Sequence, residues 1–184
     1  MKSIIKNRIT GERGFSLGEM LAALLILLLV SGILAAGIPA AARAYNDTVD
    51  AANAQILLST AMATLRDELG NASDVKNVDG STTELEYTSS YGVPSKVSTT
   101  MTKTVEDEEG NETATTETGI FITIGDTTRP LVSKRAANMN LTVTYDSISY
   151  SDGIVTVTNI HVLKGTTAVV SADTYKIRVL TGVA

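Results

Sequence analysis

The sequence has no cysteine and no tryptophan, and its aromatic side chains are limited to six tyrosines and two phenylalanines. Without cysteine no disulfide can staple the fold, which excludes the small disulfide-rich scaffolds. Many exported domains also fold without a disulfide, so this absence says little about the compartment. With so few aromatic residues, the core must be built mainly from aliphatic side chains.

Residues that carry chemistry are also scarce. His161 is the only histidine, and it lies between Ile160 and Val162 in an alternating pattern typical of an ordinary sheet or surface position. The sequence contains no phosphate-binding loop, zinc ligand set or dinucleotide fingerprint. We therefore expect no catalytic residue, no cofactor and no enzymatic activity.

The acidic segment EDEEGN at 106–111, followed by Glu112, gathers hard oxygen ligands of the kind that calcium prefers. It lacks the alternating ligand spacing of an EF-hand loop. A solvated hairpin tip is the simpler interpretation, so we predict no metal site.

The formal net charge is −5, and four basic residues, Lys2, Lys6, Arg8 and Arg13, fall within the first thirteen positions. Without residues 1–14 the chain keeps 11 basic and 19 acidic residues, a net charge of −8. Such a surface repels phosphates on average, and no motif for direct binding of nucleic acid is recognisable.

A hydrophobic run of 23 residues without any charge extends from Met20 to Ala42. Roughly 20 residues of helix span the hydrocarbon core of a bilayer, so this run predicts a single transmembrane helix. The basic flank precedes the run, which places the leader in the cytoplasm and the C-terminus outside.

An ordinary secretory signal peptide is the alternative interpretation, with Ala42-Arg43-Ala44 as its cleavage site. Three features argue against it. The apolar run is longer than a usual signal-peptide core, Glu19 interrupts its beginning, and helical periodicity continues after Ala44.

Glu19 is unfavourable at the start of a membrane helix. The free energy of inserting an acidic side chain is about 2.5 to 3.5 kcal/mol at the helix centre and less near the interface. No lysine or arginine lies between it and Arg43. A cut between Gly14 and Phe15 would create an ammonium group on a neighbouring copy that could pair with Glu19 in a low-dielectric setting. Alternatively, Glu19 lies at the headgroup level and caps the first helical turn.

The segment RGFSLGEM, Arg13–Met20, resembles the cleavage and methylation motif of type IV prepilins and type II secretion pseudopilins. The resemblance implies that prepilin peptidase cuts after Gly14 and that Phe15 becomes the N-methylated first residue. It also implies that Glu19, then the fifth residue, is the carboxylate used in assembly. It covers about thirty residues at the N-terminus, and nothing beyond them is recognisable.

Ser16 and Gly18 depart from the commonest family members, which have threonine and a branched aliphatic residue there. These departures favour a minor subunit. The expected partners are prepilin peptidase, other pilin or pseudopilin subunits, the membrane platform and lipid. The resemblance implies residence in the cytoplasmic membrane before assembly and in a pilus or at the cell surface afterwards. The alternative is a secreted or membrane-anchored β-rich binding domain.

We expect three regions: a leader at 1–14, a long helix at 15–70 and a β-rich exported head at 71–184. The helix divides into a transmembrane half, 15–42, and an amphipathic half, 43–70. Gly32, Gly37 and Pro39 predict a kink or local unwinding near 35–39.

The amphipathic half carries two apolar stripes and is expected to stop at Gly70-Asn71. One stripe comprises Tyr45, Val49, Ala52 and Ile56, and the other comprises Leu58, Met62, Leu65 and Leu69. We expect Leu58, Met62 and Leu65 to be the face that the sheet covers.

The head is rich in alternating Thr, Val, Ile and Tyr, which predicts an antiparallel sheet and an α+β fold class. The predicted strands are 83–88, 98–105, 113–124, 140–145, 154–162 and 175–180. Residues 98–124 should form a hairpin, and Asp152-Gly153 and Lys164-Gly165 should form two further turns.

Overall fold

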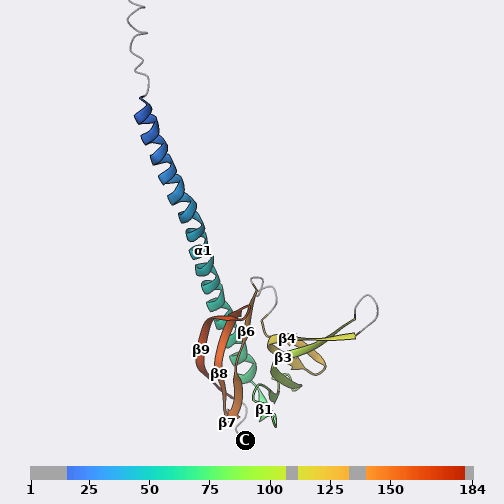
Figure 1. Ribbon diagram of the computed structural model, residues 1–184. Coiled ribbons are helices and arrows are strands. Elements are labelled where there is room, and N and C mark those ends of the chain that lie inside the picture. Colours follow the sequence, from blue (N-terminus) through green and yellow to red (C-terminus); the bar gives the residue numbers. More distant parts are fainter. Residues whose placement is uncertain (1–15, 107–111, 133–139, 181–184) are drawn as a thin grey trace, which may run out of the picture. The chain divides into compact units, whose positions relative to one another are not determined.

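The computed structural model describes residues 16–106, 112–132 and 140–180 and confirms the α+β class, with one long helix followed by two antiparallel sheets (Figure 1). The chain divides into two compact units, residues 1–47 and residues 48–184. Helix α1, Leu17–Gly70, supplies all the described secondary structure of the first unit and continues into the second.

Sheet A has five strands in sequence order, and each pairs antiparallel with the next. Its strands are β1 Ser73–Asn77, β2 Leu85–Thr88, β3 Pro94–Glu106, β4 Glu112–Ile124 and β5 Thr127–Pro130.

Sheet B is arranged around β8, which pairs with β9 on one side and with β6 and β7 on the other. Its strands are β6 Leu141–Thr144, β7 Ser147–Ser151, β8 Ile154–Lys164 and β9 Thr167–Arg178. Because β7 pairs with the first half of β8 and β6 with the second half, β6 and β7 follow one another along the same side of β8.

The hairpin turns of sheet B have the backbone that two-residue loops require. Asp152 and Gly153 both have positive φ, 52° and 76°, as in a type I′ turn between β7 and β8. Gly165, with φ of 63°, opens the turn between β8 and β9. Both predicted turns are therefore confirmed.

The core of the second unit is mainly aliphatic, as the shortage of aromatic residues predicted, and it includes Tyr87 and Tyr145. The buried face of α1 follows the spacing of one helical stripe, and consists of Ala54, Leu57, Leu58, Ala61, Leu65 and Leu69. Leu58 and Leu65 are buried as expected, whereas Met62 is only partly buried at the edge of this face.

The other predicted apolar stripe is not part of this core. Tyr45 and Ile56 are 70% and 65% exposed, so this side of α1 faces away from the protein's own side chains. The buried stripe lies around Leu57 and Ala61, which the sequence pattern did not single out.

Each of the six predicted strand segments overlaps an observed strand, and the hairpin of 98–124 is present as the β3–β4 pair. The boundary of β9 was wrong, because this strand begins at Thr167 and ends at Arg178. Strands β1, β5 and β7 were missed. They are four or five residues long and polar, so alternation gave little signal.

Candidate assembly site

Helix α1 begins with a reciprocal capping box. The backbone N–H of Ser16 donates to Oε2 of Glu19 at 2.9 Å, and the backbone N–H of Glu19 donates to Oγ of Ser16 at 3.2 Å. Ser16 is therefore the N-cap and Glu19 the third helical residue, the S-x-x-E arrangement that satisfies two otherwise unpaired donors. The negative side chain also lies at the positive end of the helix dipole.

This geometry bears on the two interpretations of Glu19. The capping interpretation describes the arrangement in this chain. The pairing of Glu19 with a neighbour's terminal amine stays a prediction. Gly14 and Phe15, the expected cleavage and methylation positions, lie outside the described residues. The two interpretations are compatible, because a carboxylate has about four acceptor sites and this cap uses few of them.

The apolar residues that follow Glu19 are exposed in the described part of the chain. Between Met20 and Ala42 the large hydrophobic side chains range from 48% exposed at Val30 to 66% at Ile38. Among the described residues, α1 is the helix long and apolar enough to cross a membrane, judged by length and composition. A signal sequence near an N-terminus meets the same criterion. A soluble monomer rarely exposes an apolar surface this large.

The predicted interruption of the helix is not seen as unwinding, because α1 is assigned as one helix through Gly32, Gly37 and Pro39. A bend at these residues stays a prediction. A Cβ atom built at Gly32 or Gly37 would meet nothing within 4 Å. The packing of the described residues therefore does not require glycine at either position.

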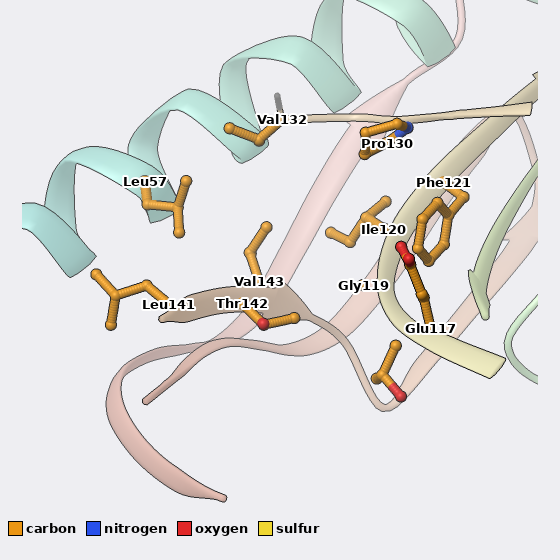
Figure 2. Close-up of a pocket in the computed structure, with 11 residues that line it drawn as sticks. Leu57, Glu117, Gly119, Ile120, Phe121, Pro130, Val132, Leu141, Thr142 and Val143 are labelled. Atoms are coloured by element: carbon orange, nitrogen blue, oxygen red, sulfur yellow. The ribbon is translucent and has the colours of Figure 1, made fainter. Parts of the chain in front are cut away.

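A cleft of about 290 Å³ opens where α1 meets both sheets. Figure 2 shows its apolar lining, with Leu57 of α1, Ile120 of β4 and Val143 of β6 around the same space. The titratable residue in its lining is Glu117. This cleft has the character of incomplete core packing between layers, and it does not gather groups for acid–base chemistry.

His161 occupies an ordinary position in β8. Its Nδ1 lies 2.8 Å from the backbone oxygen of Asn159 and 3.9 Å from Oδ1 of Asp146. The short contact to a carbonyl oxygen favours the tautomer that carries a proton on Nδ1. Within the described ranges no three His, Asp or Glu side chains come together as a metal site. The acidic segment considered for calcium lies mostly outside those ranges.

Two buried tyrosines stabilise the head. The hydroxyl of Tyr87 donates to Oε1 of Glu68 on α1 at 3.0 Å, and the hydroxyl of Tyr145 donates to the backbone oxygen of Thr83 at 2.8 Å. Burial raises the pKa of both phenols well above the usual value, and the nearby Glu68 carboxylate raises that of Tyr87 further. The first contact connects β2 to α1, and the second connects the segment between β6 and β7 to the segment before β2.

Comparisons with protein-family models, with curated proteins and with solved structures found no match to this chain.

Proposed function

We infer that this chain is a structural subunit, of the minor kind, of a type IV pilus or a related type II secretion-like filament. Prepilin peptidase would remove residues 1–14, and Phe15 would be N-methylated. The apolar part of α1 would hold the subunit in the cytoplasmic membrane, with the head outside, until assembly. In the filament the same segment would pack among the helices of neighbouring subunits.

The observation that carries this proposal is the difference between the N-terminal and C-terminal parts of α1. Its N-terminal part is apolar and exposed, whereas its C-terminal part is amphipathic and buries Leu65 and Leu69 in the head. A targeting segment alone has no need to continue as the core helix of the exported domain. A filament subunit needs both, since one part packs against neighbours and the other carries the head.

The motif and the cap support the same proposal. Glu19 lies in the first turn of α1 behind Gly14 and Phe15, where the resemblance places the assembly carboxylate. Its capping box with Ser16 fixes the carboxylate at the helix end where a cut after Gly14 would expose a new amine.

A secreted or membrane-anchored β-rich binding domain is the second candidate, favoured by the similarity of the apolar segment to a signal sequence. Cleavage at Ala42-Arg43-Ala44 would fall inside α1, which is continuous there. It would separate the exposed apolar part from the helix that forms the core.

Intact mass and N-terminal sequencing of the exported protein distinguish the two candidates. The filament proposal expects a chain that begins at Phe15 and carries one extra methyl group. A chain that begins near Tyr45, or one that retains residues 1–14, would contradict it.

A further inference from the structure

Among the described strands, the outer edges of β1, β5 and β7 are protected. The Asn77 side chain on β1 donates to the backbone oxygen of Tyr150 at 2.9 Å and accepts from its backbone N–H at 2.7 Å. Because Tyr150 belongs to β7, this pair of hydrogen bonds covers the edges of both strands. The backbone N–H of Ile148 donates to the oxygen of Thr82. Strand β5 has only four residues and ends in Pro130. Short strands, proline and side-chain cover are the usual protections of an edge.

The outer edge of β9 differs from these edges in length and composition. It is twelve residues long, contains no proline, and among the described strands it pairs only with β8. Its outer edge therefore presents backbone donors and acceptors that another strand can use.

A groove of about 940 Å³ lies between this edge and α1. Met62 and Ala63 of α1 contribute apolar surface to its lining. Its charged residues are Arg66, Asp67, Lys176 and Arg178. The groove thus carries a net charge of +2, and it suits an extended, acidic segment with small side chains.

The outer part of the β3–β4 hairpin contains an extended, acidic segment with small side chains. Beyond a bulge opposite Thr99, residues 100–106 pair with residues 112–118, while β2 and β5 pair only with the inner parts of this hairpin. We call this outer two-stranded part the arm. Figure 1 shows it extending away from the other strands of the head. A lone two-stranded ribbon is marginally stable in water, so an arm of this kind gains stability from a partner.

The bulge that starts the arm is built into the sequence. The Oγ of Ser98 donates to the backbone oxygen of Thr100 at 3.1 Å, and Gly119 lies opposite on β4. A Cβ atom at Gly119 would come within 3.4 Å of the Phe121 ring. Bulges bend a strand and redirect it, which here separates the arm from the inner hairpin.

The two strands of the arm differ in charge. The β3 side carries Lys103, whereas residues 114–118 on the β4 side carry Glu117 and no basic residue. The β4 side is therefore complementary in charge to the groove, and its residues Ala114, Thr115 and Thr116 have small side chains.

We propose that residues 112–118 of one copy add as an extra strand to the free edge of β9 in a second copy. The contact joins different surfaces of the two copies, so it propagates from copy to copy instead of closing a dimer. This proposed contact rests on the proposed function in one respect, because filament assembly would bring the copies together.

The absence of native cysteine allows a direct test by disulfide trapping in the full-length exported protein. One copy carries Thr116→Cys and the other carries Thr174→Cys, and the two copies are expressed together and oxidised mildly. A parallel experiment replaces Thr116→Cys by Thr115→Cys, which lies on the opposite face of the same strand. Tyr91→Cys, at an 88% exposed position, replaces the arm cysteine in the matched control. The linked peptides are identified by mass spectrometry.

We expect the arm–β9 disulfide to exceed the Tyr91 control several-fold with one of the two arm cysteines. Equal yields, or no link in chains that are correctly processed after Gly14 and assembled, would overturn the contact and leave the proposed function standing. A disulfide dimer formed by Thr174→Cys alone would show that β9 pairs with β9, which also contradicts the inference.

Charge reversal provides a second test. Lys176→Glu should lower the yield of the arm–β9 link several-fold at low salt, and high salt should weaken the link in the parent protein. Lys76→Glu, an exposed reversal on β1, should leave the yield unchanged. An equal effect of both reversals would indicate a general charge effect and would contradict docking in this groove.

Discussion

Replacing Glu19 by glutamine removes one negative charge from the start of α1 but keeps a side chain that can cap the helix. The S-x-x-E/Q box tolerates either residue, so Glu19→Gln should retain the contacts with Ser16. Ser16→Ala does the reverse, because it removes the N-cap hydroxyl and leaves the charge. The pair separates the two roles of Glu19, capping and electrostatic pairing.

The two variants differ in expected magnitude. Loss of an N-cap costs about 1 kcal/mol, which is roughly a fivefold change in an equilibrium. Breaking a buried ion pair by removing one partner costs about 3 to 5 kcal/mol, or at least about a hundredfold. Under the proposed function, Glu19→Gln should reduce assembly far more than Ser16→Ala, although the glutamine variant keeps the better cap.

The assay compares filament-bound with membrane-bound protein and measures the processed fraction of each by intact mass. Both variants should be cut after Gly14, so that a loss of filaments reports assembly and not processing. The electrostatic reasoning is refuted if Glu19→Gln assembles like the parent chain. It is also refuted if Ser16→Ala and Glu19→Gln lose assembly equally, since capping would then account for both.

Three further predictions concern the head, measured by thermal unfolding of the full-length protein in detergent. Leu65→Ala should cost about 2 to 5 kcal/mol because this side chain is fully buried, whereas Ile56→Ala, at a 65% exposed position, should change stability little. Gly153→Ala should destabilise by about 1 kcal/mol because φ is 76° in the β7–β8 turn, and an unchanged melting temperature would contradict the type I′ assignment. The Tyr145 phenol has its pKa raised in the folded state, so the stability it contributes is complete below pH 10.0, its ordinary pKa, and is lost as the pH rises further. Tyr145→Phe should flatten this alkaline loss relative to Tyr91→Phe, and identical pH profiles would show that the buried phenol is not its source.

The sequence predicted the elements whose patterns are long. The end of α1 at Gly70 follows from glycine and asparagine after the last apolar position, and the β7–β8 turn follows from Asp152-Gly153. The short strand β1 escaped prediction because its place depends on a distant partner. Asn77 contacts Tyr150 across 73 positions of sequence, and no local pattern reports such a contact.

At the candidate site, residue identity could be predicted but geometry could not. The sequence singled out Glu19 by its isolation in an apolar run, and it also permitted a capping role. It did not identify Ser16 as the partner, although S-x-x-E is a recognisable capping signature. In the sequence Ser16 stands out only as a departure from the family motif.

The capping box and the proposed assembly role reinforce one another physically. A buried carboxylate is costly unless its oxygens are hydrogen-bonded, and the Ser16 N–H already satisfies part of that need inside a single chain. Cleavage after Gly14 would leave this contact intact, because the peptide bond between Phe15 and Ser16 is not the one that is cut. The ammonium of a neighbouring copy would then meet a carboxylate that is already fixed at the start of α1. The energetic gain on assembly would therefore come from charge pairing, with little further loss of side-chain freedom at Glu19.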